Sequence, residues 1–266
     1  MPEVRDWVRG LALVLSRGCR AVEAGGDAYA IVGRRRGTEG ASTADDGSSS
    51  GVEVSLARHS AGVRDLAEQF ARAAGVPADR VPDLALAGWL HDVGKADPRF
   101  QVWLHGGNEM AAALADSPLA KSARGFRNRS ALRRARERAG YPEGGRHEVE
   151  SLALIAPHEQ LQRQAHDWDL VQHLVVSHHG FGRPFVPAIV DPQPASTILN
   201  HGGQRLAHDG SGPVPPLGDA CTVAERYWRL VRRYGWWGLA WFEAILRLAD
   251  HRTSERESAE EGGHGV

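Results

Sequence analysis

Two pairs of adjacent polar residues, each at the end of an apolar run, constrain the fold of this chain most strongly. The pairs are His91-Asp92 and His178-His179, and a glycine follows within two residues of each. Apolar residues at helical spacing that run into a glycine are typical of helices that end there. We therefore expect both pairs beside helix C-termini, where the partial negative charge of the helix favours a cation.

Helical spacing continues through most of the chain after residue 52, where apolar residues recur at three- and four-residue steps. Gly94 is expected to cap the end of one helix, and Asp167 the start of another. Residues 180–219 are rich in proline and glycine, which predicts a long irregular segment. The fold class is therefore all-α. The predicted helices cover residues 63–74, 81–93, 98–105, 130–139, 147–156, 167–179, 222–233 and 237–253.

Composition divides the chain into three parts. Residues 1–51 are expected to form an N-terminal appendage, with a short helix at 7–15, a β-like run at 29–32 and then a Gly/Ser-rich linker. Residues 52–254 form the predicted main domain. Residues 255–266 are acidic and glycine-rich, which predicts a disordered tail.

Charge and cysteine content indicate the compartment. The formal net charge is −1, with 32 Lys and Arg against 33 Asp and Glu, so total charge favours neither a nucleic acid nor a membrane as partner. The two cysteines, Cys19 and Cys221, form no closely spaced pair, which favours a reducing compartment. No apolar run reaches about 18 residues, and the N-terminus lacks the order of a signal peptide. We expect a soluble cytoplasmic protein with no membrane partner.

Histidine and aspartate residues occur in an order that suits transition-metal binding. Neutral imidazoles and carboxylates are ligands of divalent transition metals, and five or more of them can hold two ions. Taken singly, each has an ordinary interpretation as a hydrogen-bonded or exposed histidine, or as a capping or ion-paired aspartate. Their joint occurrence favours a metal site that performs hydrolysis. The candidate ligands are His59, His91, Asp92, His147, His178, His179 and Asp250.

Asp250 gives a separate indication of the same site. Four-residue steps place Phe242, Leu246 and Asp250 on one face of the last predicted helix. A carboxylate that extends an apolar stripe is costly to bury unless it is paired or bound to a metal. We therefore expect Asp250 to reach the cavity that holds the two pairs.

The ordered set resembles the HD phosphohydrolase superfamily and, within it, the HD nuclease domain of the CRISPR type I signature helicase-nuclease. The resemblance covers residues 52–254. It is carried by the strings SLARHS, GWLHDVGK, RHE, SHHGFGRP and LRLADHRTS. The string SHHGFGRP favours the CRISPR branch and is most similar to the subtype in which the HD domain follows the helicase. This resemblance implies an HD-domain helical bundle with a small irregular or β N-terminal appendage.

The resemblance also implies roles for the candidate residues. Asp92 would bridge two divalent transition-metal ions, with Mn, Fe, Ni or Co as the preferred metals and Mg as a further candidate. Lys95 would neutralise charge on the scissile phosphate, so that Asp92 and Lys95 are the catalytic residues. The first ion would be held by His59, His91, Asp92 and Asp250, and the second by Asp92, His147, His178 and His179.

Cationic and aromatic side chains are candidates for contacts with DNA. Arg183, which lies close to His178-His179 in the sequence, is the one residue that we assign to nucleic-acid binding. Arg-rich helices are commonly solvated faces, and the adjacent Trp236-Trp237 is interpreted as part of a core. The weaker candidates are residues 121–138, Arg226, Arg229, Arg232, Arg233, Trp103, Phe181, Trp236 and Trp237.

The chain departs from the family in one respect. It has no GxxxxGK[ST] string and no Asp-Glu-x-His/Asp motif, so it lacks the ATP-driven helicase half. We expect a separate nuclease subunit, or a domain of a longer protein, that works with a helicase and a CRISPR effector complex. Single-stranded DNA is the expected substrate, because an unwound strand can reach a recessed pair of metal ions.

Two other interpretations stay open. HD enzymes also hydrolyse nucleotides or cyclic dinucleotides, although the cyclic-dinucleotide branch carries a His-His-Glu string and this chain has His178-His179-Gly180. A one-metal nucleotidase would need no second histidine pair. A catalytically silent HD scaffold would bind nucleic acid or a protein partner and would hold the same ligand set in poor geometry.

Overall fold

The computed structural model describes residues 19–25, 28–33, 52–123, 129–186, 191–210 and 220–262. Contacts divide the chain into two compact units, Met1–Ser42 and Thr43–Val266. The helix predicted at residues 7–15 and the predicted linker before residue 52 lie outside the described residues.

The first unit contains a two-stranded antiparallel sheet. Strand β1 (Cys19–Gly25) pairs with β2 (Ala28–Gly33), and the register shifts by one irregularity between Glu23 and Gly25. The β-like run predicted at 29–32 falls within β2.

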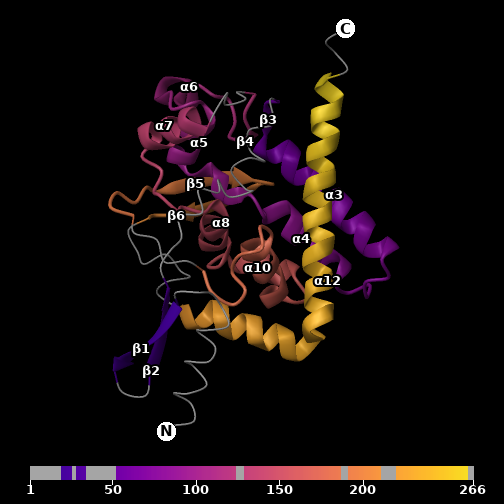
Figure 1. Cartoon of the computed structure of the whole chain (residues 1–266). Coiled ribbons are helices and arrows are strands. Elements are labelled where there is room, and N and C mark those ends of the chain that lie inside the picture. Colours follow the sequence, from indigo (N-terminus) through magenta and orange to yellow (C-terminus); the bar gives the residue numbers. More distant parts are fainter. Residues whose placement is uncertain are drawn as a thin grey trace. The chain divides into compact units, whose positions relative to one another are not determined.

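The second unit is built mainly from helices, which confirms the all-α fold class (Figure 1). Short paired strands join them: β3 (Val54–Ser55) with β4 (Leu119–Lys121), and β5 (Thr197–His201) with β6 (Gln204–His208). The helices are α3 (Leu56–Ala73), α4 (Val81–Leu90), η1 (Val93–Ala96, a 3-10 helix), α5 (Pro98–Leu104), α6 (Glu109–Ala113), α7 (Arg129–Ala139), α8 (His147–Ile155), α9 (Glu159–Gln164), α10 (Trp168–Ser177) and α12 (Ala220–Gly262).

A single apolar core joins α3, α4, α8, α10 and α12. Helix α3 packs against α4 and α12, and α10 packs against α4, α8 and α12. Apolar residues at helical spacing produce this packing, as Val63, Leu66 and Ala67 show on the buried face of α3. Side-chain caps fix two helix starts, because Ser55 accepts a hydrogen bond from Arg58 N and Asp167 accepts one from Leu170 N. The predicted cap at Asp167 is confirmed.

Gly94, which was predicted to cap the helix before it, has a different role. Helix α4 stops at Leu90, and Gly94 lies in η1 without a positive φ, so the prediction that Gly94 caps the helix is wrong. A Cβ on Gly94 would lie 2.0 Å from His147 O and 2.4 Å from Ser151 N. The missing side chain therefore lets η1 approach the backbone of α8.

Two further predictions need correction. The segment 180–219 was expected to be irregular but contains the β5–β6 hairpin, anchored by stacking of His201 on Trp89 at 3.9 Å between ring centroids. The two last predicted helices, 222–233 and 237–253, are confirmed as the two arms of α12, which a non-helical residue, Gly235 (φ 71°, ψ 169°), separates at the bend that Figure 1 shows. The tail from residue 255 is helical as far as Gly262, because Glu257 is buried against residues of the main domain.

Candidate metal centre

Five segments deliver the candidate ligands to one place. His59 lies in the first turn of α3, and His147 is the first residue of α8. Each adjacent pair lies just past the C-terminus of a helix, His91-Asp92 after α4 and His178-His179 after α10, while Asp250 projects from α12. The structure brings together all the ligands predicted from the sequence: His59, His91, Asp92, His147, His178, His179 and Asp250.

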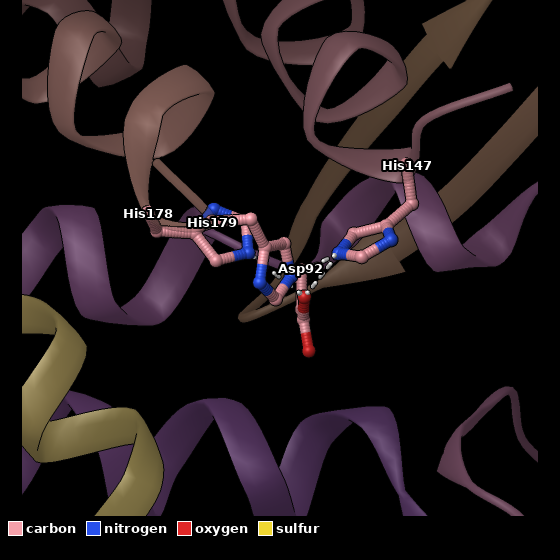
Figure 2. Close-up of side chains that lie close together, drawn as sticks. All are labelled: Asp92, His147, His178 and His179. Atoms are coloured by element: carbon pink, nitrogen blue, oxygen red, sulfur yellow. Dashed lines mark hydrogen bonds and ion pairs between the residues drawn. The ribbon is translucent and has the colours of Figure 1, made fainter. Parts of the chain in front are cut away.

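Asp92 lies at the centre, and its two carboxylate oxygens face different histidines. Oδ2 lies 3.6 Å from His59 Nε2 and 3.4 Å from His91 Nε2. Oδ1 lies 3.0 Å from His147 Nε2 and 3.6 Å from His178 Nε2. Figure 2 shows His147 on one side of Asp92 and the ends of His178 and His179 on the other. A single carboxylate is therefore shared by two groups of imidazoles.

Asp250 completes the group on the Oδ2 side. Its Oδ1 lies 3.2 Å from His59 Nε2 and 4.0 Å from His91 Nε2. The Asp250 side chain is 17% exposed, and His179 is partly exposed, whereas the other ligands are buried. The site therefore opens towards solvent beside Asp250 and His179.

Hydrogen bonds at Nδ1 orient the buried imidazoles. His91 Nδ1 donates to Gly88 O and His178 Nδ1 donates to Val175 O, both at 2.7 Å. A carbonyl oxygen only accepts, so each ring carries its proton on Nδ1 and leaves Nε2 as an unprotonated donor for a metal. Both Nε2 atoms are buried and lack a hydrogen-bond partner among the described residues. Such unsatisfied nitrogens are costly unless a cation binds to them.

His147 and His179 bring two further imidazole nitrogens together. Their Nε2 atoms face each other at 3.2 Å. One ring can donate an N–H to the other in the metal-free protein, and the same two nitrogens are close enough to bind one cation together. The donor set of imidazoles and carboxylates matches the transition metals rather than the all-oxygen sites of Mg or Ca.

The charged surroundings shift the pKa values of the ligands. Burial favours neutral Asp92, but His91, Lys95 and His147 outweigh it and hold the pKa of Asp92 well below its usual value. Burial opposes protonation of His59, yet hydrogen bonds with Asp250 and Glu257 raise its pKa to about 8.

The pKa values of His147 and His179, on the Oδ1 side of Asp92, shift in the opposite direction. Burial lowers the pKa of His147, although its hydrogen bond with Asp92 partly compensates. Burial, together with the neighbouring His178 and His147, lowers the pKa of His179. These two imidazoles are therefore neutral at physiological pH, the form that binds metals.

Lys95 and Arg183 have other partners than the sequence suggested. Lys95 is only 5% exposed, and its Nζ lies 2.7 Å from Asp92 Oδ2. Its ammonium group therefore points at the shared carboxylate instead of at solvent. Arg183 lies at the rim, where it pairs with Glu243 and donates to Gly180 O.

Several of the weaker candidates for DNA contacts are neutralised or buried. Arg229 pairs with Asp169 and Arg233 with Asp167, while Lys121 is buried against Glu257. The interpretation of Trp236 and Trp237 as core residues is wrong, because their side chains are 59% and 90% exposed.

Sequence reasoning missed two supporting residues. Glu257 accepts from His59 Nδ1 at 3.1 Å and from Lys121 Nζ at 2.7 Å, so it orients His59 as a carboxylate commonly orients a metal-bound histidine. Its position seven residues after Asp250, two helical turns on the same face, was the available signal. Ser151 joins α8 to the His91-Asp92 turn: its Oγ donates to His91 O and accepts from Gly94 N, both at 2.8 Å.

The helical fold and the histidine–aspartate centre define a metal-dependent phosphohydrolase of the HD class. A scan against protein-family models matches residues 51–208, more than half of the chain, to the family described as "Cas3, HD domain". The chain belongs to this family, which confirms the resemblance to the HD nuclease of the CRISPR type I helicase-nuclease. A Cas3 HD domain is a metal-dependent nuclease of CRISPR type I defence. Asp250 and Glu257 lie after the matched residues.

Comparison with curated proteins and with solved structures gave no match. Within the described residues, no helix combines the length and the apolar character needed to cross a bilayer.

Proposed function

We propose that this chain hydrolyses phosphodiester bonds of single-stranded DNA with a pair of divalent transition-metal ions that share Asp92. The observation that carries the proposal is that the two carboxylate oxygens of Asp92 face two separate groups of histidines. Each group, together with Asp92, offers three or more ligand atoms within 4.8 Å of one another. Mn, Fe, Ni and Co suit these ligands best.

The proposed ligand sets follow the two sides of Asp92. Metal ions bound there would supply an activated water and would stabilise the charge that develops on the phosphate. The first set is His59, His91, Asp92 and Asp250, and the second is Asp92, His147, His178 and His179.

The chain's own residues prepare the site for this chemistry. Lys95 keeps Asp92 ionised and fixes its orientation through the ion pair at Oδ2. We propose this positioning role for Lys95 in place of direct contact with the scissile phosphate. The carbonyl groups of Gly88 and Val175 fix the tautomers of His91 and His178, so that both Nε2 atoms face the centre.

Single-stranded DNA is the proposed substrate because the ligands are recessed. Most of them are buried, and the site opens beside His179 and Asp250, which suits one strand better than a rigid duplex. The sequence carries no ATP-driven motor motifs, so we propose that a helicase subunit or domain and a CRISPR effector complex deliver the strand in the cytoplasm. Residues 52–254 are the proposed nuclease domain, and the contacts of Glu257 extend it along α12.

The test combines metal analysis and nuclease assay on one preparation. We expect purified protein with Mn²⁺ or Ni²⁺ to cut single-stranded DNA without ATP, and EDTA to stop the reaction. Circular and linear strands compared side by side would distinguish endonuclease from exonuclease activity, and an RNA strand would test the choice of nucleic acid. Cleavage that persists in EDTA would contradict the mechanism. Hydrolysis of nucleotides or cyclic dinucleotides without DNA cleavage would instead support the other HD interpretation.

A further inference from the structure

Exposed aromatic rings gather where α12 bends. Trp228 and Trp236 lie on either side of Gly235, and their side chains are 42% and 59% exposed. The two rings meet edge to face at 5.6 Å, and both contact Tyr227, at 5.2 Å and 6.2 Å between ring centroids. Large exposed aromatic groups cost free energy in water, and a cluster of them marks a binding surface.

Contacts connect this cluster to the open side of the metal centre. The ring of Tyr227 lies 5.7 Å from that of His173, and His173 Nε2 lies 2.7 Å from Glu243 Oε1. Glu243 also pairs with Arg183, whose Nη2 contacts Gly180 O beside His179. The buried His173 and the largely buried Glu243 therefore link the aromatic cluster to the rim of the site, and the exposed residues at the two ends of this link, Trp228, Trp236 and Arg183, form a strip.

Guanidinium groups stand along the same strip. A Cβ on Gly180 would lie 3.4 Å from Arg183 Nη2 and 3.6 Å from Arg247 Nη1, so both cations stand over this glycine next to the ligands. Arg247 has no carboxylate within ion-pair distance among the residues that the structure describes. Arg232 is exposed and lies four residues after Trp228, which places the two on one helix face.

We propose that this strip is a binding track for single-stranded nucleic acid. Tyr227, Trp228 and Trp236 stack on bases, while Arg247 and Arg232 contact phosphates, so that the strand leads to the metal centre. Stacking platforms combined with cations are the usual means of binding a single strand without sequence preference. The proposal rests on the proposed nuclease function and adds the route by which substrate is held.

The distribution of charge favours a nucleic acid over a protein as occupant. The centre of a protein–protein interface is depleted in charge. Here guanidinium groups lie on the helix face of Trp228 and at the rim of a site that is proposed to act on phosphodiesters. A strand that follows the strip would contact both kinds of group in turn.

The test measures strand binding without cleavage. Fluorescence anisotropy with a labelled oligo(dT) of about 16 nucleotides, the upper size of such sites, is measured in EDTA for the whole chain. The double variant Trp228→Ala/Trp236→Ala is expected to bind about ten- to a hundred-fold more weakly. Trp237→Ala is the matched control, because Trp237 is 90% exposed but makes no ring contact with the cluster; its affinity should match wild type.

Two further measurements make the outcome decisive. Arg232→Glu reverses an exposed charge without altering the packing of the rings, and it should weaken binding severalfold even if the double variant is unstable. Hydrolysis of bis-p-nitrophenyl phosphate, a small phosphodiester that reaches only the metal centre, should stay unchanged in Arg232→Glu and in the double variant.

The possible results separate the two proposals. Unchanged oligo(dT) affinity in Arg232→Glu and in the folded double variant would overturn the track, even if wild type cleaves DNA, and would leave the surface to a protein partner. An equal loss in Trp237→Ala would overturn the assignment to these rings. If the variants lost oligo(dT) binding and the wild-type protein hydrolysed no phosphodiester, the track would be supported and the proposed function refuted.

Discussion

The two sides of the metal centre differ in their charged surroundings. On the Oδ2 side of Asp92, His59 lies between two further carboxylates, Asp250 and Glu257. On the Oδ1 side, His147 and His179 face each other as neutral rings, and burial lowers the pKa of both. The His59 imidazole on the first side holds a proton that a cation must displace, whereas burial keeps His147 and His179 on the second side neutral. A shared carboxylate can thus join two sites with different proton requirements.

The largest effect should come from removing the shared ligand. Asp92→Ala takes one ligand from both ions and leaves Lys95 without its partner, so we expect cleavage to fall by more than about 100-fold, beyond the loss caused by a supporting residue. Metal analysis should show loss of both ions, and circular dichroism should still show a helical protein. Full activity of this variant would remove the bridging mechanism.

Single ligand changes should separate the two sides. His59→Ala and His179→Ala each remove a ligand from one side only, so each variant should lose one of the two proposed ions and keep the other. Calorimetric titration with Mn²⁺ would count the ions retained. If either variant lost both ions, the two sides would form one cooperative unit.

Loss of the carboxylate behind His59 should have a moderate effect. Glu257→Gln keeps an acceptor for His59 Nδ1 but removes its charge, so metal affinity on that side should fall about 10- to 100-fold. Glu260→Gln, one turn further along the exposed face of α12, is the matched control and should bind metal as wild type does. Equal behaviour of the two variants would show that Glu257 does not support His59.

The metal-free protein should lose stability as the pH rises through the range in which His59 titrates. Folding raises the pKa of His59 from 6.5 to about 8, so its contribution is complete below pH 6.5 and is lost as the pH rises through 8. A shift of this size corresponds to about 2 kcal/mol in the free energy of unfolding. Burial lowers the pKa of His178, but the Asp92 carboxylate beside it outweighs burial and raises that pKa, so His178 adds to the loss.

Denaturant unfolding in EDTA at pH 6.5 and pH 8.5 would measure this change. His59→Asn should reduce it clearly. A stability that rises over this interval would contradict the assignment of a raised pKa to the His59 side.

The smallest effect should come from Arg183→Ala. Its guanidinium group is already paired with Glu243 and is 40% exposed, so we expect DNA affinity to fall only severalfold and metal content to stay unchanged. Anisotropy with oligo(dT) and metal analysis on one sample would compare the two. An equal loss of metal would assign Arg183 to the structure of the site.

Several supporting features depended on contacts that no local pattern reveals. The helices and the helix-end positions of His91-Asp92 and His178-His179 followed from apolar spacing and glycine, which act within a few residues. The role of Gly94 did not follow from local spacing, because this glycine lies close to the backbone of α8, more than fifty residues later in the sequence. The sequence likewise suggested a phosphate as the partner of Lys95. Only the structure shows that the Lys95 side chain is buried and that its ammonium group lies beside the carboxylate of Asp92.

By itself, the sequence determined the all-α class, the set of histidines and aspartates that lie close together in the structure and the resemblance to a Cas3 HD domain, because helix periodicity and ligand chemistry are properties of residues and their spacing. Only the tertiary structure decided which oxygen of Asp92 faces which histidine, that Glu257 supports His59, and that Trp228 and Trp236 are exposed beside the bend of α12. These outcomes depend on how distant helices pack. The partner and the exposure of a side chain are set by that packing.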